Sequence, residues 1–93
     1  MDHIQLGKPY KVSEHKHEQY VRHYEVPIAD CVVVPVKKYG DHISCDLIWR
    51  DASGEAHHRD ELMFNAAYLE PIDAIRDYSL YDLWEEYEKD RTH

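Results

Sequence analysis

Residues 31–64 read CVVVPVKKYGDHISCDLIWRDASGEAHHRDELMF, and they contain two patterned apolar runs. The first run, residues 31–36, is rich in valine, which favours a strand. In the second run, residues 42–50, apolar and polar side chains alternate as they do along a half-buried antiparallel strand. A turn centred on Gly40 separates the two runs. We therefore expect a β-meander.

A second hairpin is predicted directly after the alternating run. Asp51 suits the start of a type I turn, and Gly54 suits the position that needs a positive φ. The return strand, residues 56–64, is polar until Leu62, so we expect it to twist or bulge before it reaches the core. Pro35 has no N–H for a strand ladder, which predicts that the first strand lies at an edge or at a bulge.

The two cysteines are expected to be reduced thiols. If the apolar faces of the first hairpin align, Val34 shares a side with Cys45 and Leu47, and Cys31 lies on the opposite face. The two sulfur atoms then cannot meet, because a disulfide needs Cα atoms within about 7 Å of each other. Free thiols are typical of a reducing compartment, and the simplest role for each cysteine is that of a small buried hydrophobic residue.

The N-terminal part of the chain predicts a lead-in and one short helix. Residues 1–12 have no sustained hydrophobic period, so we expect a tail or a lead-in strand there. Residues 13–26 favour a helix because Ser13 can cap it, apolar and aromatic side chains recur at helical spacing, and Pro27 would end it. A strand is the competing interpretation, since β-forming residues are dense in this segment.

Residues 79–91 predict an amphipathic helix. Ser79 is a suitable N-cap, and Asp82 three residues later resembles the second member of a capping box. Apolar side chains then recur at i, i+3, i+4 and i+7, which places them on one side of a helix. These apolar positions are Leu80, Leu83, Trp84 and Tyr87.

These segments define an α+β domain, built either as a small antiparallel β-meander or as a barrel of SH3-like architecture. Residues 1–93 are expected to form a single small domain. No apolar run approaches the roughly 18 residues that span a bilayer, and the N-terminus is too polar for a signal peptide, so we expect a cytoplasmic protein without membrane contact. The expected segments are 1–12 (tail or lead-in), 13–26 (helix), 30–72 (meander) and 79–91 (C-terminal helix).

The sequence contains no glycine-rich phosphate loop, Cys-x-x-Cys pair, nucleophile elbow or His-Glu-x-x-His motif. We therefore expect a protein that is not an enzyme. One alternative is a small thiol-dependent enzyme. A four-residue loop in the second hairpin would place His58 opposite Leu47 and Asp60 opposite Cys45, so that a Cys, a His and an Asp share one face. A three-residue loop would swap the faces and remove this site.

A small metal-binding or regulatory barrel is the other alternative. The chain has eight histidines, and its two cysteines complete enough ligands for one zinc ion. Their spacing fits no standard finger or ribbon, so we expect neither a metal nor another cofactor. The residues that would have to meet are His15, His17, His57, His58, Cys31 and Cys45.

Negative charge is concentrated at the C-terminal end of the chain. Residues 70–90 hold eight acidic residues against two basic ones, a net charge of −6, in a chain of net charge −8. Such a segment repels a nucleic acid, whereas it attracts a protein with a basic, nucleic-acid-binding surface. Tyrosine and tryptophan are frequent in the same segment, and aromatic residues commonly anchor interfaces.

The resulting hypothesis is a non-catalytic interaction protein whose acidic, tyrosine-rich C-terminal face docks on a basic protein surface. In its sharper form the protein is a nucleic-acid mimic that inhibits its partner, since small acidic domains without catalytic motifs are typical of anti-restriction and anti-CRISPR inhibitors. We expect no direct contact with nucleic acid, and a homodimer is compatible with the sequence. The expected binding residues are Tyr78, Tyr81, Asp82, Glu85, Glu86 and Glu88.

Overall fold

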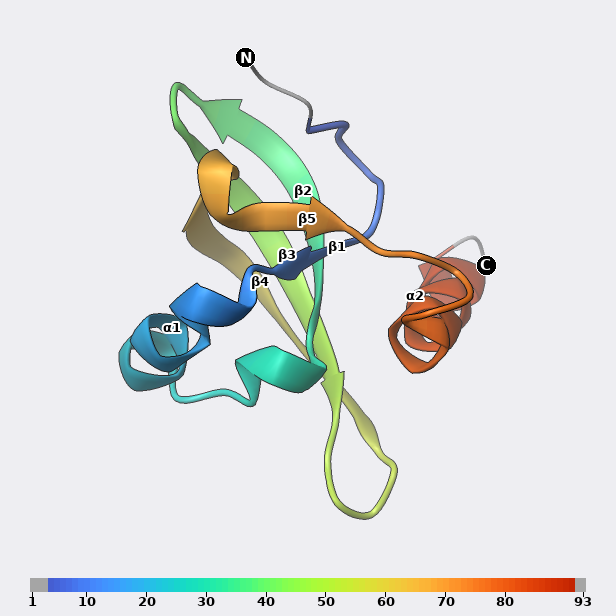
Figure 1. Cartoon of the computed structure of the whole chain (residues 1–93). Helices are drawn as coiled ribbons and strands as arrows, with labels where there is room; N and C mark the ends of the chain where they lie inside the picture. Colours follow the sequence, from blue (N-terminus) through green and yellow to red (C-terminus); the bar gives the residue numbers. More distant parts are fainter. Residues whose placement is uncertain (1–3, 92–93) are drawn as a thin grey trace.

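The computed structural model describes residues 4–91 of the chain, with the side chains of residues 4–90. Within these residues it contains five strands, two α-helices and three short 3-10 helices (Figure 1). In chain order they are β1 (Tyr10–Val12), η1 (Glu14–Lys16), α1 (His17–Tyr24), η2 (Ile28–Asp30), β2 (Val32–Tyr39), β3 (His42–Arg50), β4 (Ala56–Asn65), η3 (Ala66–Tyr68), β5 (Leu69–Pro71) and α2 (Tyr78–Arg91).

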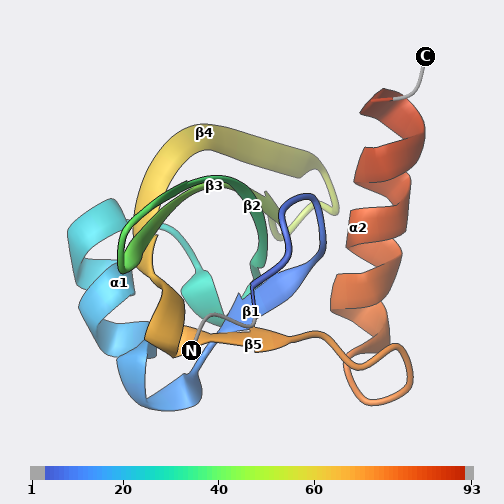
Figure 2. The ribbon, with the colours of Figure 1, turned by 90° about the horizontal axis from the view of Figure 1, so that it is seen from above.

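The five strands form one antiparallel sheet in the order β4-β3-β2-β1-β5. Strands β2, β3 and β4 make the predicted meander, and its two turns hold Gly40 and Gly54 at φ of 66° and 88°. The sheet is strongly curved, and α2 lies against its convex side (Figure 2). Within residues 4–91 no pairing joins β4 to β5, so the sheet is open. The predicted α+β class is confirmed.

The register of the first hairpin differs from the predicted one. Val33 pairs with Leu47, so Val33 faces the main core on the concave side of the sheet. Val34, which was expected to share a side with Leu47, faces the other way, and that prediction is wrong. The cause is a bulge between Pro35 and Lys37, because one extra residue in β2 turns the rest of the strand over. The bulge beside Pro35 was predicted, but β2 lies inside the sheet and not at its edge.

Both cysteines lie in the main core as fully buried, free thiols. The prediction that they stay unpaired is confirmed, although the predicted placement on opposite faces is wrong. Each thiol donates a hydrogen bond to a backbone carbonyl oxygen, Cys31 to Pro27 at 3.1 Å and Cys45 to Ile43 at 3.5 Å.

Helix α2 covers the convex face of the sheet. Ile48 and two valines of β2 form a second buried cluster there with Leu83. The predicted apolar side of the helix is therefore confirmed. The helix begins at Tyr78, so Ser79 lies inside its first turn and is not the N-cap that the sequence suggested. Neither α-helix of the described chain is long and apolar enough to cross a membrane. The other side chains packed on this cluster are Ile72, Leu80, Trp84 and Tyr87.

The N-terminal part of the chain supplies an interior strand and the short helix. β1 lies between β2 and β5, as a lead-in strand, while residues 1–3 lie outside the described residues. The helical interpretation of the next segment is correct, and Tyr20 of α1 packs on Phe64 with ring centroids 4.8 Å apart. Ser13 does not cap this helix. Its hydroxyl donates instead to Glu70 at 2.7 Å, because the pairing of β1 with β5 brings the two residues together.

β4 contains the predicted bulge. Cys45 pairs with Leu62, whereas Leu47 pairs with Arg59, so two residues of β4 face one residue of β3. Glu61 lies in this bulge with φ of 59°, in the left-handed region that suits a bulged strand. The bulge bends the polar first half of β4 away from the apolar second half.

Candidate functional site

The predicted binding residues meet on the solvent side of α2. At 100° per residue, Tyr78, Asp82 and Glu85 fall on one stripe, directly opposite the side that packs on the sheet. Tyr81 and Glu88 flank the stripe on one side and are half-buried, while the exposed Glu86 flanks it on the other. We call Asp82 and Glu85 the acidic stripe.

Two carboxylates of the acidic stripe have no compensating partner. Asp82 and Glu85 are exposed, and neither makes an ion pair or hydrogen bond to another residue of the described chain. Glu86 differs, because it forms an ion pair with the guanidinium of Arg50 on β3. Arg50 also donates to the carbonyl of Gly54 at 3.1 Å, so this pair ties α2 to the second hairpin. The charge available to a partner is therefore that of Asp82 and Glu85.

Two exposed apolar side chains, Tyr78 and Ile75, precede the acidic stripe in the chain, and we call them the apolar rim. Tyr78 is 72% exposed and Ile75 is 86% exposed. Ile75 was missed from the sequence, because it lies in a short segment, residues 73–77, that shows no sustained helical or strand period. The other predicted aromatic, Tyr81, packs on Trp84 with ring centroids 5.5 Å apart, so it is less available to a partner.

The loop that carries Ile75 is fixed by its own carboxylates. Asp73 accepts the N–H groups of Ile75 and Arg76, and these bonds lower the pKa of its carboxyl group. Asp77 accepts the N–H of Asp73 and also bonds the ammonium of Lys11 at 3.0 Å, and both contacts lower its pKa. The apolar rim is thus presented on an ordered turn.

The alternative thiol-dependent site is not formed. Leu47 pairs with Arg59 and not with His58, and Cys45 pairs with Leu62 and not with Asp60, so the predicted juxtaposition of Cys, His and Asp is wrong. The loop of this hairpin, residues 51–55, is one residue longer than the four-residue loop that the prediction assumed, and this shifts the register by one residue at Leu47. The bulge between Cys45 and Leu47 adds a second shift at Cys45.

Both cysteines are also shielded from solvent in the folded chain. Burial raises the pKa of Cys31 and of Cys45 to about 12, because the thiolate form loses its hydration. The six residues considered for zinc are not brought together in the described chain, since both thiols are in the core. His17 bonds the carbonyl of Val12 at 2.7 Å, and His57 bonds Asp51 at 2.8 Å.

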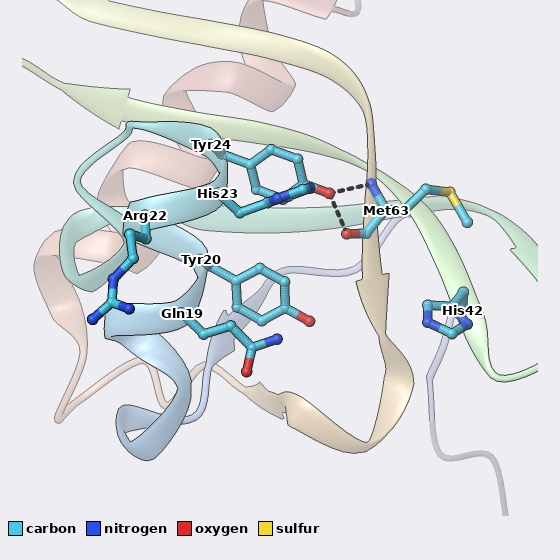
Figure 3. A pocket seen from close by; sticks show the side chains of 7 residues that line it. All are labelled: Gln19, Tyr20, Arg22, His23, Tyr24, His42 and Met63. Carbon is cyan, nitrogen blue, oxygen red and sulfur yellow. Dashed lines mark hydrogen bonds between the residues drawn. The ribbon is translucent and has the colours of Figure 1, made fainter.

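An open cleft of about 530 Å³ lies between α1 and the meander (Figure 3). The hydroxyl of Tyr24 donates to the carbonyl of Met63 at 2.6 Å and accepts its N–H at 3.1 Å. The hydroxyl of Tyr20 accepts the N–H of Asn65 at 3.2 Å. Two tyrosines therefore satisfy backbone groups on the free edge of β4, which indicates a structural role for this part of the cleft. The lining residues are Gln19, Tyr20, Arg22, His23, Tyr24, His42 and Met63.

Comparison of the chain with models of known protein families, with curated proteins and with solved structures finds no match. Evidence on function therefore comes from the surface chemistry of the chain itself. Its most distinctive feature is the acidic stripe with the apolar rim beside it.

Proposed function

We propose that the protein is a non-catalytic interaction protein that docks on a basic protein surface through α2. The observation that carries this proposal is the pair of exposed carboxylates, Asp82 and Glu85, without partners on a helix that is held firmly against the sheet. Tyr78 and Ile75 beside them supply apolar area of the kind that anchors interfaces. Charge then steers the encounter, and the apolar rim holds the complex.

The sharper proposal is that the acidic stripe mimics a nucleic acid and inhibits a nucleic-acid-binding partner. Asp82 and Glu85, the two exposed carboxylates without partners among the described residues, are three residues apart, so they lie about 4.5 Å apart along the helix axis. Duplex DNA presents negative charges at a comparable spacing, roughly one per 3.4 Å along each strand. A basic groove shaped for phosphates would accept this pair of carboxylates.

The proposal also includes a cytoplasmic location and an SH3-like fold. Two free thiols support a reducing compartment such as the cytoplasm. The strand order, with the 3-10 helix η3 leading from β4 into β5, supports an SH3-like small barrel. Small barrels host many binding functions, so this fold agrees with an interaction role without specifying the partner.

The test compares two variants of equal net charge. One carries Asp82→Lys and Glu85→Lys in the acidic stripe. The control carries Glu14→Lys and Asp60→Lys, which are exposed on other elements. Each pair of reversals changes the net charge from −8 to −4. Glu86 is left intact because its reversal would also break the ion pair with Arg50.

The three proteins are immobilised and exposed to a cell extract enriched in heparin-binding proteins. We expect the unmutated protein and the control to retain the same partner, and the stripe variant to lose it. Duplex DNA added to the complex should displace the partner if the stripe mimics DNA. If the stripe variant retains the partner as well as the unmutated protein does, the partner binds another surface. If both variants lose the partner, binding depends on the net charge of the protein and not on the acidic stripe.

A further inference from the structure

The tip of the second hairpin brings three potential metal ligands together. One ligand atom each from Asp51, Glu55 and His57 lie within 4.8 Å of one another. This set shares no residue with the acidic stripe, and of the residues considered for zinc in the sequence it contains only His57. Carboxylate oxygen and imidazole nitrogen form a mixed donor set that divalent metals such as zinc accept.

Two of the three ligands are already held in position. Asp51 accepts with one oxygen from the N–H of Ser53, the hydroxyl of Ser53 and the N–H of Glu55. Its second oxygen lies 2.8 Å from Nε2 of His57. The His57 ring stacks on Trp49, with centroids 5.7 Å apart and planes 23° apart. The turn and the stack therefore aim one oxygen and one nitrogen at each other, as ordered supporting contacts do in metal sites.

The third ligand supplies a negative charge without a counter-ion. The Glu55 carboxylate has no ion-pair or hydrogen-bond partner among the described residues, although it lies near the Asp51 carboxylate. The nearby guanidinium of Arg50 is engaged by Gly54 and Glu86. A positive charge on His57 would compensate the Asp51 carboxylate, which lies 2.8 Å away, and would leave the Glu55 carboxylate without a counter-ion. A divalent cation would bind both carboxylates and the imidazole at once.

The distances suit a zinc-sized ion. Ligand atoms at about 2.1 Å from zinc are about 3.4 Å apart in a tetrahedron. The contact of 2.8 Å between Asp51 and His57 widens slightly to reach this value. The separations from the Glu55 carboxylate, which are within 4.8 Å, close by movement of this exposed side chain.

We propose that Asp51, Glu55 and His57 form a surface site for a divalent cation of the zinc type, with water completing its coordination. Binding there would join the two strands of the hairpin and remove two units of negative charge from its tip. The site is independent of the proposed partner surface, so either proposal can fail without the other.

The test is a titration of the purified full chain with zinc chloride, followed by calorimetry and by NMR of the Trp49 indole and the His57 ring. His57→Gln removes the nitrogen ligand. Glu55→Gln removes the negative charge of a side chain that supports no contact of the turn, so it preserves the fold. His58→Gln is the matched control, because His58 also faces a carboxylate, Asp60 at 3.8 Å, but has no third ligand among residues 4–90.

We expect one zinc ion per chain, with the signals of Trp49 and His57 shifting together. Affinity should fall at least about tenfold in both His57→Gln and Glu55→Gln and stay unchanged in His58→Gln. Any other pattern overturns the site. Absence of saturable binding would leave His57 and Asp51 as a proton-bridged pair, and an equal loss in His58→Gln would mean unspecific binding by exposed histidines.

Discussion

Cys31 and Cys45 show how burial controls reactivity at single residues. Burial raises the pKa of each thiol to about 12, so near neutral pH the unreactive thiol form predominates, and both sulfur atoms are shielded from solvent. We expect iodoacetamide to modify neither cysteine in the folded protein and both in urea, as read by mass spectrometry. Rapid alkylation of either thiol without denaturant would contradict its placement in the core.

The same two residues show what the sequence could and could not predict. Their unpaired state was predicted correctly, but from a register that is wrong. The alignment assumed an unbroken hairpin, and the bulge after Pro35 moves Val33 into the place expected for Val34. An added residue can be detected in a sequence only where polar and apolar residues alternate, and residues 32–36 of β2 are apolar on both faces of the sheet, so the sequence carried no sign of it.

Helix α1 protects the free edge of β4 through Tyr24. Its hydroxyl accepts the N–H of Met63 and donates to the carbonyl of the same residue, so Tyr24→Phe removes the hydrogen-bond partner of both backbone groups. We expect a loss of about 0.5–1.5 kcal/mol in the free energy of unfolding, measured by urea denaturation. Tyr39→Phe is the control, because Tyr39 is 53% exposed and its contact with Lys37 uses the ring and not the hydroxyl. Equal stability of the two variants would show that the hydroxyl of Tyr24 contributes nothing.

The turn before α2 should make stability depend on pH. The N–H of Asp73 and, second, the ammonium of Lys11 lower the pKa of Asp77. A carboxyl group whose pKa is lowered on folding stabilises the protein above its ordinary pKa of about 4 and loses this effect as pH falls through the lower folded value. The difference in unfolding free energy between the natural protein and Asp77→Asn should therefore be larger at pH 7 than at pH 3. A difference that is the same at both pH values would exclude a role for the charge of Asp77.

Elements with a strong period were the ones that the sequence predicted well. The meander followed from alternation and two glycine turns, and the buried side of α2 followed from the spacing of Leu80, Leu83 and Trp84. The N-terminus of α2 was misplaced because Ser79 has the residue type of a cap, while the preceding turn is fixed by Asp77 through distant Lys11. Local residue types do not report contacts of that kind.

Across the whole molecule, the sequence predicted where negative charge is concentrated, but not which of the acidic side chains are paired within the fold. The acidic segment was evident from composition. Its division into the ion-paired Glu86 and the partnerless Asp82 and Glu85 depends on where Arg50 of β3 lies, which only the packing of α2 on the sheet determines. The cleft beside α1 likewise forms between segments that are distant in sequence.

The separation of charge from apolar anchors predicts different effects on the two rate constants of binding. Long-range attraction acts before contact, so for the partner captured in the pull-down the association rate constant should fall steeply as salt rises from roughly 50 to 500 mM, with little change in dissociation. Tyr78→Ala removes contact area but no charge, so it should accelerate dissociation while the salt dependence of association persists. Surface plasmon resonance measures both constants. Association that is indifferent to salt would refute steering by the acidic stripe, and unchanged dissociation of Tyr78→Ala would place the anchor elsewhere than at the start of α2.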